Sequence, residues 1–253
     1  MNNLNILVED DVEFVIVGDV HEHSEQFTKA LEKLGESKSR IFISVGDLYH
    51  KGFGTNKAEY MIDELIRLES ENIGFMVKGN HEIKELKRSK NVSSQLKWAS
   101  NRPLIYSFKY KNYETRLTIV HGGIGLYHNW ENINSSIDLA YIRTLDNDGE
   151  KIPLQWVEIN GNRSLKPTKE GIIWHKLYDG RFGYVASGHD SQKDGVAKFY
   201  KHSCNLDSAV YETGILSGII FSKDGIKEKF TITGPTKAWH EEDTPPYEFF
   251  RKN

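Results

Sequence analysis

Residues 12–21 read VEFVIVGDVH, a short apolar and β-branched run that ends in glycine, aspartate and histidine. The same design recurs at residues 40–52 (RIFISVGDLYHKG) and at residues 73–82 (IGFMVKGNHE). Apolar runs of this kind predict strands that are buried on both faces. The segments between them, residues 25–35 and 55–68, space their apolar residues as amphipathic helices do. This β-α-β-α-β order predicts a parallel sheet with right-handed crossovers.

Strand-like runs also fill the second half of the chain. We expect a hairpin from residues 104–110 and 115–120, and helices at residues 129–144 and 169–178. Residues 146–168 are polar and rich in turn-forming residues, which predicts an insertion or lid. Short runs broken by Gly, Asp, Asn or Ser, as in antiparallel sheets, predict further strands at residues 184–188, 197–201, 210–211, 215–221 and 228–232.

The simplest architecture for these elements is two sheets stacked between helices in one domain. A chain of 253 residues is long for a single domain, but an α/β fold reaches this length. We therefore expect residues 1–253 to form one domain, with residues 236–253 as an extended C-terminal tail.

Composition excludes several classes of protein. The 33 Lys and Arg residues against 36 Asp and Glu give a formal charge of -3, so a strongly basic nucleic-acid footprint is absent. No apolar run approaches the ~18 residues of a membrane helix, and the first residues do not resemble a signal peptide. The single cysteine, Cys204, excludes an intramolecular disulfide and points to a cytoplasmic setting.

Polar clusters follow five of the expected strands. Because parallel strands end at one edge of a sheet, residues 18–21, 46–52 and 79–82 should converge there. HGG at residues 121–123 and GHD at residues 188–190 follow two later strands. One carboxylate can bridge two ions ~3.5–4 Å apart, the arrangement that hydrolyses phosphate esters. Carboxylate, imidazole and amide ligands suit Mn, Fe, Zn or Ni, and the set here is Asp19, His21, Asp47, Asn80, His121 and His189.

The series GDVH, GDLYHKG, GNHE, VHGGI and GH resembles the calcineurin-like metallophosphoesterase superfamily. GNHE, VHGGI and a GH without a second histidine after it resemble the phosphoprotein phosphatase branch, closest to its bacterial and phage-type members. Residues 204–219 look like the closing strands of that branch, and the resemblance spans residues 12–222. It implies an α/β fold: a four-layer αββα sandwich of two mixed sheets flanked by helices.

The resemblance also implies a role for each matching residue. His81 would be the general acid, and the nucleophile would be a hydroxide that bridges two divalent transition-metal ions and attacks phosphorus directly. Manganese is the first expectation for these ions, with iron, zinc or nickel as alternatives. The implied metal ligands are Asp19 and His21 on the first ion, Asp47 bridging both, and Asn80, His121 and His189 on the second.

The second cluster departs from the family pattern. The branch usually reads GDxVDRG there, with the second Asp orienting the catalytic histidine and the Arg binding phosphate, but this sequence has His50 and Lys51. Lys51 can still neutralise phosphate as a point charge. His50 cannot act as an anionic partner of His81, so Glu82 or another acid would have to do so. Glu22, which replaces a glycine, would add negative charge near the phosphate.

Two further basic residues are candidate phosphate contacts. Arg143 lies in YIRTLDNDG, and Lys176 follows Trp174 at the spacing that the branch uses for a phosphate contact. Both flank segments that carry metal ligands, and a phosphate site needs cations.

The expected function is a two-metal phosphatase acting on phosphomonoesters. Its substrate would be a phosphoprotein (Ser/Thr or Tyr) or a nucleotide, with nucleic acid involved only as a phosphorylated end and no membrane partner. One alternative is a phosphodiesterase or dinucleoside polyphosphate hydrolase. The other is a catalytically impaired binding module on the same scaffold, which the changes at His50, Lys51 and Glu22 would mark.

Overall fold

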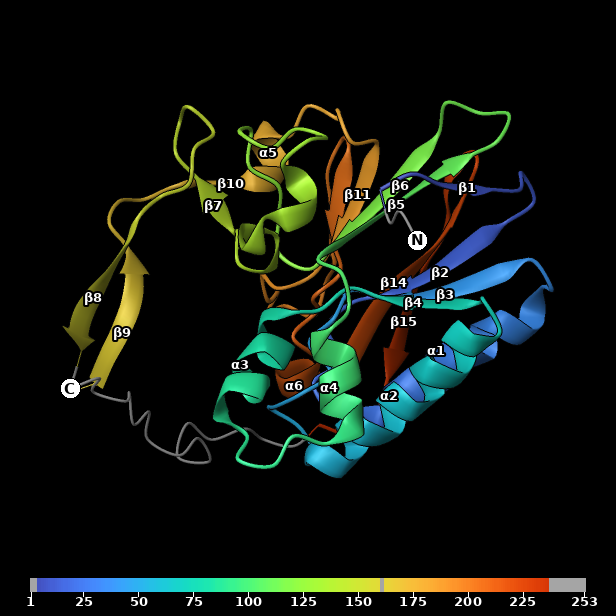
Figure 1. The fold of residues 1–253 in the computed structure, drawn as a ribbon, viewed down its shortest axis with the longest axis horizontal. Helices are drawn as coiled ribbons and strands as arrows, with labels where there is room; N and C mark the ends of the chain where they lie inside the picture. The colour runs from blue at the N-terminus through green and yellow to red at the C-terminus, as the bar shows by residue number, and fades with distance from the viewer. Residues whose placement is uncertain (1–3, 160–161, 237–253) are drawn as a thin grey trace.

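Two large sheets pack face to face at the centre of the computed structural model, which describes residues 4–159 and 162–236 (Figure 1). The five-stranded sheet contains, in spatial order, β15 (Gly225–Thr233), β14 (Ile215–Ser222), β2 (Glu13–Val17), β3 (Arg40–Ser44) and β4 (Gly74–Met76). The six-stranded sheet contains β1 (Ile6–Val8), β5 (Ile105–Tyr110), β6 (Arg116–Val120), β11 (Tyr184–Ser187), β13 (Ser203–Asn205) and β12 (Lys198–Phe199).

The first half of the chain folds as its apolar pattern predicts. Strands β2, β3 and β4 pair in parallel, with Val15 opposite Phe42 and Phe42 opposite Gly74. The predicted helices are α1 (Ser24–Glu32), followed by a short 3₁₀ turn, and α2 (Thr55–Ser70). Both helices cover the outer face of the five-stranded sheet (Figure 1).

The inner faces of the two sheets form the central layer of the core. Phe14 of β2 is fully buried and lies 4.7 Å, between ring centroids, from Phe108 of β5. Ile16 and Ile43 from the same side join Leu117 in this cluster. The side chains alternate across each strand, so the same strands that present Val15 and Val17 to the helices present Phe14 and Ile16 to the second sheet.

The outer layer on the six-stranded sheet consists mainly of loops and short turns. The helix expected at residues 129–144 is wrong: the segment forms the 3₁₀ turns Ile133–Ser135 and Ile137–Ala140 and then strand β7 (Thr144–Leu145). The carboxamide oxygen of Asn129 accepts from the backbone N–H of Glu131 and Asn132, and such local bonds compete with a helix.

Three other expectations need correction. Residues 169–178 form strand β10 (Ile172–Ile173) and one turn of helix, α5 (Trp174–Leu177), instead of a full helix. Residues 210–211 belong to the short helix α6 (Val210–Thr213), which begins after a left-handed Ala209. Strand β11 pairs in parallel with both β6 and β13, so this part of the second sheet is not antiparallel.

Several elements carry no clear signal in the sequence. They are β1, β13 and the two helices α3 (Asn80–Arg88) and α4 (Ser94–Ser100). Helix α3 follows the GNHE cluster directly and is mostly polar, so its apolar face is too narrow to predict a helix. It nevertheless carries several residues of the candidate site.

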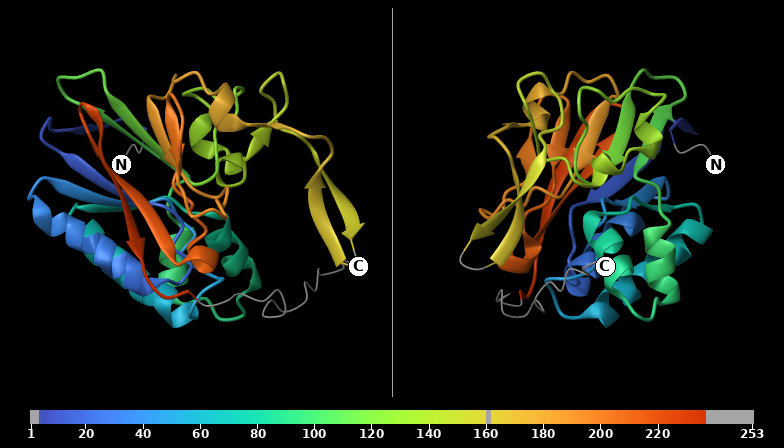
Figure 2. Two further views of the ribbon diagram at one scale, coloured as in Figure 1. Left: turned by 180° about the vertical axis from the view of Figure 1, so that it is seen from behind. Right: turned by 60° about the vertical axis from the view of Figure 1, so that its left-hand side comes forward.

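The expected insertion at residues 146–168 contains the antiparallel hairpin of β8 (Leu154–Ile159) and β9 (Asn162–Pro167). The hairpin projects away from the two large sheets (Figure 2). Its role as a lid stays a prediction. The expected tail at residues 236–253 lies, beyond its first residue, outside the described residues, and no helix among the described residues is long and apolar enough to span a membrane.

Replacing Phe14 by alanine tests the packing between the sheets. Phe14→Ala leaves a cavity in a fully buried cluster, so the free energy of unfolding should fall by about 3–5 kcal/mol. The exposed Val196, replaced by alanine as a control, should change it by less than about 0.5 kcal/mol. Urea unfolding measures both, and equal losses would show that the inter-sheet layer is not the main core.

Candidate metal centre

The five polar clusters meet in one place. Asp19 follows β2, Asp47 follows β3, and Asn80 begins the helix after β4. His121 follows β6 and His189 follows β11, and the backbone N–H of Gly188 donates to the His121 carbonyl. The backbone N–H of His189 also donates to the Asp19 carboxylate at 3.1 Å. Loops from both sheets therefore converge at the carboxyl ends of their parallel strands.

The Asp47 carboxylate lies at the centre of the cluster. Its Oδ2 atom is 3.2 Å from Nε2 of His121, 4.0 Å from Nε2 of His21 and 3.9 Å from Nε2 of His81. Asp47 belongs to two groups whose ligand atoms lie within 4.8 Å of one another, one with His21 and His81 and one with His121 and His189. A carboxylate shared by two such groups has the position that a bridging ligand requires.

The two remaining predicted ligands lie in the same cluster. Oδ2 of Asp19 is 3.9 Å from Nε2 of His21, and Oδ1 of Asn80 is 3.0 Å from Nε2 of His121. The structure thus brings all six predicted ligands together. It also places His81, the predicted general acid, within reach of the first group of ligand atoms. The assignment of these six residues as metal ligands and of His81 as the general acid stays a prediction.

Two histidines are oriented in the way that metal-binding histidines are. Nδ1 of His21 is 3.1 Å from the Tyr49 carbonyl oxygen, and Nδ1 of His121 is 2.9 Å from the Val45 carbonyl oxygen. A carbonyl only accepts, so Nδ1 of each ring donates and Nε2 is the nitrogen that faces Asp47. Backbone carbonyls fix the tautomer and orientation of metal ligands in the same way.

The charges of the cluster require a cation. Burial and the neighbouring carboxylate of Asp207 raise the pKa of Asp19 well above its usual range. Burial lowers the pKa of His121, but the carboxylates of Asp47 and Asp19 outweigh it and raise that pKa to about 10. In the protein alone, a proton on His121 supplies the positive charge that the buried carboxylates need. Divalent cations would supply the same charge, so the residues present fit a metal centre.

Glu82 supports the cluster through the backbone. Its carboxylate accepts hydrogen bonds from the N–H groups of Asp47 at 2.9 Å, Leu48 at 2.7 Å and Gly79 at 2.7 Å. Glu82 therefore ties the loop after β3 to the start of α3 and does not contact the His81 side chain in the described structure. The expectation that Glu82 is the acidic partner of His81 is not supported by these contacts.

Glu22 has a similar role in the loop after β3. It is buried, and its carboxylate accepts from the N–H groups of His50 at 2.9 Å, Gly52 at 3.2 Å and Gly54 at 2.9 Å. The negative charge that the sequence places near the site is thus engaged by the backbone of this loop.

The backbone of the clusters is strained. Among the described residues, eight other than glycine have positive φ, and six of these lie in the polar clusters or directly after one: His21, Glu22, Asp47, His50, Lys51 and His189. Side chains disfavour this conformation, which persists where surrounding contacts enforce it, most often at functional sites. The hydrogen bonds to Glu22 and Glu82 are such contacts.

The three predicted phosphate contacts differ in whether the structure places them beside the candidate metal ligands. Nζ of Lys51 is 4.1 Å from the centroid of the Tyr211 ring, which in turn packs edge-on against His21. Nη2 of Arg143 donates to the His189 carbonyl at 3.0 Å. Lys176 is exposed on α5, in the outer layer. The structure places Lys51 and Arg143 beside the ligands, whereas no described contact does so for Lys176.

Two residues near the site were not predicted. Tyr211 lies on α6, in a segment that the sequence pattern assigns to a strand. Glu85 lies on α3, four residues after His81 and so on the same helical face. The spacing of His81 and Glu85 would place both near the site only after α3 had been recognised as a helix.

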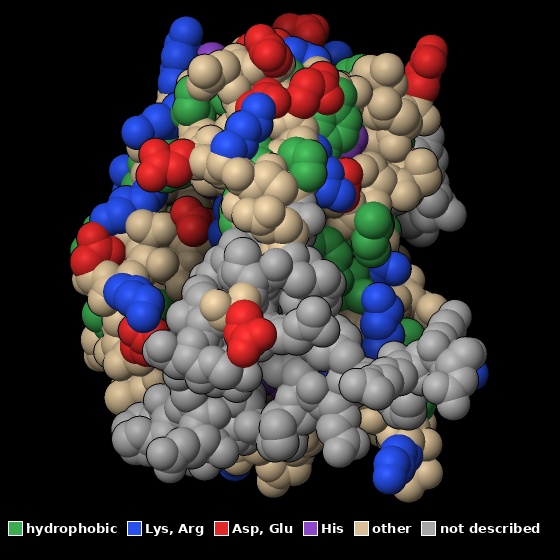
Figure 3. All heavy atoms as spheres, turned by 90° about the vertical axis from the view of Figure 1, so that its left-hand side faces the viewer, with side chains coloured by type: hydrophobic (Ala, Val, Ile, Leu, Met, Phe, Trp, Pro, Cys, Tyr) green, Lys and Arg blue, Asp and Glu red, His purple; other side chains and the backbone are tan. Residues whose placement is uncertain are grey.

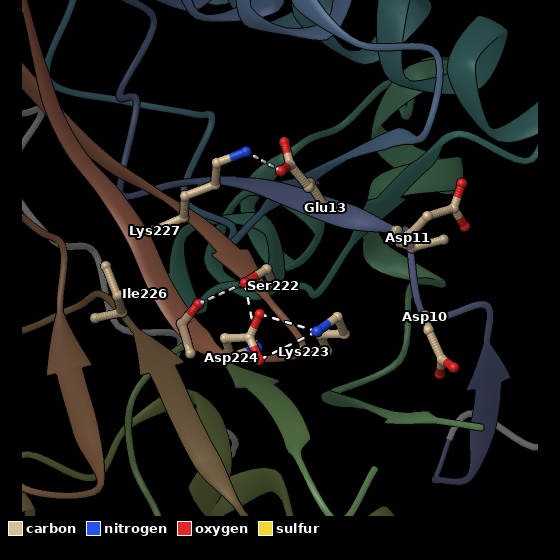
Figure 4. A pocket seen from close by; sticks show the side chains of 10 residues that line it. Asp10, Asp11, Glu13, Ser222, Lys223, Asp224, Ile226 and Lys227 are labelled. Atoms are coloured by element: carbon tan, nitrogen blue, oxygen red, sulfur yellow. Dashed lines mark hydrogen bonds and ion pairs between the residues drawn. The ribbon is translucent and has the colours of Figure 1, made fainter. Parts of the chain in front are cut away.

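A separate pocket of about 350 Å³ lies at the other end of β2 (Figure 4). Its charged side chains are already engaged: Lys223 pairs with Asp224 at 3.0 Å and Lys227 with Glu13, while the carboxylates of Asp10 and Asp11 accept hydrogen bonds from Asn112 and Ser39. On the face shown in Figure 3, the described basic and acidic side chains are interspersed. Neither feature offers a concentrated charge for a ligand, so we assign no function to them.

The fold and the cluster together define an α/β protein with a candidate two-metal centre. The sequence matches the family described as calcineurin-like phosphoesterase over residues 12–207. The chain belongs to this family and is therefore a phosphoric ester hydrolase. A search of curated protein sequences finds no match.

Solved structures share the fold. A putative diadenosine tetraphosphatase is 21% identical and superposes with a TM-score of 0.67, covering 93% of this chain and 100% of its own. A serine/threonine phosphatase from Saccharomyces cerevisiae is 14% identical, with a TM-score of 0.52 and coverage of 92% and 84%. A cold-active protein tyrosine phosphatase is 16% identical, with a TM-score of 0.51 and coverage of 91% and 80%. At these identities the comparison establishes the fold alone.

A single methyl group tests the close packing of the cluster. A Cβ at Gly188 would lie 1.8 Å from Oδ1 of Asp19, so Gly188→Ala must displace this carboxylate. We expect the purified variant to bind Mn²⁺ at least about 10-fold more weakly, as changes beside metal ligands do. Elemental analysis and calorimetric titration measure the loss.

Gly35→Ala is the matched control, because a Cβ there meets nothing within 4 Å. It should bind Mn²⁺ as the wild type does. Unchanged Mn²⁺ affinity in Gly188→Ala would show that Asp19 does not hold a metal ion.

Proposed function

We propose that this protein is a two-metal-dependent phosphatase that hydrolyses phosphomonoesters. The observation that supports it best is the position of Asp47, whose carboxylate belongs to both groups of candidate metal-ligand atoms. Single-metal sites have no need of a shared carboxylate. Family membership limits the reaction to phosphoric esters and so removes unrelated two-metal chemistry.

Two divalent ions would be held by the six predicted ligands, with Asp47 shared. When bound, they would supply a water of lowered pKa and positive charge for the phosphate oxygens. The mixture of carboxylate, imidazole and amide donors suits manganese, iron, zinc and nickel, and manganese is the first candidate.

The protein's own side chains would do the remaining work. His81 is buried and directs Nε2 to the side of Asp47, where it would donate a proton to the leaving oxygen. Lys51 and Arg143 lie beside His21 and His189 and would neutralise charge on the phosphate. Lys176 is a third candidate for this role, supported by its position in the sequence.

The substrate would be a phosphoprotein or a nucleotide. A second candidate is cleavage of a dinucleoside polyphosphate, because the solved structure with the TM-score of 0.67 is titled a putative diadenosine tetraphosphatase and is matched over its full length. A diadenosine polyphosphate assayed beside phosphopeptides and nucleotides separates the two candidates. Binding of phosphate compounds without hydrolysis of any would favour the impaired binding module.

Hydrolysis of an aryl phosphate in Mn²⁺ tests the proposed function. Asp47→Asn removes the shared negative charge, and we expect kcat to fall at least about 100-fold because the bound ions lose their common ligand. Asp224→Asn, in the pocket at the other end of β2, is the matched control and should leave kcat unchanged. Equal activity of wild type and Asp47→Asn would refute the proposal.

His81→Asn tests the general acid separately. Loss of a general acid lowers kcat by about 10²–10⁴-fold when the leaving group is poor, and by less when it is good. Phenyl phosphate should therefore lose more activity than p-nitrophenyl phosphate. The same loss for both substrates would assign His81 another role, such as metal binding.

A further inference from the structure

We propose that His50 and Glu85 are positioning residues that hold the His81 ring through a hydrogen-bonded chain, Glu85 to His50 to His81. The chain would replace the single carboxylate that the phosphoprotein phosphatase pattern, which this sequence resembles, has at the position of His50. The inference rests on the proposed role of His81 as the group that serves the leaving oxygen.

The contacts of the three side chains are short. Nδ1 of His50 lies 2.8 Å from Nδ1 of His81, and Nε2 of His50 lies 2.6 Å from Oε2 of Glu85. The side chains of His50 and Glu85 are about one fifth exposed, at 22% and 20%, whereas His81 is buried. The chain therefore runs from the rim of the site to its interior.

The donors in the chain are fixed by chemistry. An ionised carboxylate only accepts, so Nε2 of His50 donates to Glu85. The two Nδ1 atoms must then share one proton, whichever ring carries it. In either case Nδ1 of His81 is engaged, and its Nε2 is the atom left facing Asp47. Rotating the His81 ring would break this bond. The chain therefore fixes the orientation of the ring and determines that Nε2 faces the site.

Glu85 is itself held in place. Oγ of Ser89 donates to Oε1 of Glu85 at 2.8 Å. His81 and Glu85 lie four residues apart on one face of α3, and Ser89 is the residue directly after this helix. The hydrogen bond from His50 lowers the pKa of Glu85 to about 2, so this carboxylate stays ionised at neutral pH.

His50 is held from the other side by its backbone. Its N–H donates to Oε1 of Glu22, and its φ is 70°, a conformation that the surrounding loop must enforce. Glu82 is not available for the same task, because its carboxylate accepts three backbone N–H groups. Glu22 and His50 are two of the departures from the family pattern. They belong to one local arrangement that directs the His50 imidazole toward His81.

A double-mutant cycle tests the chain. We compare Glu85→Gln, His50→Asp and the double variant, using phenyl phosphate and p-nitrophenyl phosphate in Mn²⁺. Glu85→Gln should lower kcat for phenyl phosphate about 10-fold, leave KM unchanged and affect p-nitrophenyl phosphate less. In His50→Asp the new carboxylate should contact His81 directly, so adding Glu85→Gln should then have no further effect. Aspartate also tolerates the positive φ at this position.

The exposed Glu114→Gln is the matched control and should behave as the wild type. Melting temperatures and bound Mn²⁺ are measured for every variant, and we expect both to be unchanged. Wild-type kcat in Glu85→Gln on both substrates, or the same loss in the His50→Asp background, would overturn the inference. So would an equal loss on both substrates that accompanies loss of metal.

An NMR measurement separates this inference from the proposed function. In the wild type, the proton shared by the two Nδ1 atoms should give a downfield imidazole resonance that is absent from His50→Ala and shifted in Glu85→Gln. Its appearance supports the chain even if no substrate is hydrolysed. Its absence from the wild type would overturn the chain, whereas a leaving-group effect in His81→Asn alone would leave the proposed function standing.

Discussion

The buried carboxylate of Asp47 is the group on which the rest of the site depends. It is 2% exposed and lies amid three imidazoles and the carboxylate of Asp19. A buried negative charge is costly unless cations surround it. Two kinds of cation could balance the negative charge of Asp47 in this site: protonated histidines or bound metal ions. The backbone carbonyls that accept from Nδ1 of His21 and His121 leave Nε2 of each ring facing Asp47, and Nε2 is the atom with which either histidine would bind an ion.

This constraint also explains the unusual backbone around the site. Bringing ligands from two sheets within a few ångströms requires sharp turns after several strands, and six residues accept positive φ to make them. Buried carboxylates that receive several backbone N–H groups, Glu22 and Glu82, hold these turns. The two-sheet core, with Phe14 packed on Phe108, gives the loops a rigid base.

Much of this arrangement could be predicted from the sequence. The parallel strands and helices of the first half follow from local periodicity, and convergence of the clusters follows from parallel topology. The second half of the chain is harder to predict from the sequence. Its strands are short, and its turns depend on side-chain hydrogen bonds such as those of Asn129. The contact between His50 and Glu85 joins a loop to a helix that has no strong apolar face, so no pattern in the sequence indicates it.

The central claim is that two metal ions share Asp47. Electron paramagnetic resonance of the protein loaded with two equivalents of Mn²⁺ tests it most directly, because ions ~3.5–4 Å apart couple magnetically. The account predicts a spin-coupled spectrum in the wild type that is lost in Asp47→Asn. The spectrum of isolated Mn²⁺ ions in the loaded wild type, or a coupled spectrum that survives in Asp47→Asn, would contradict it.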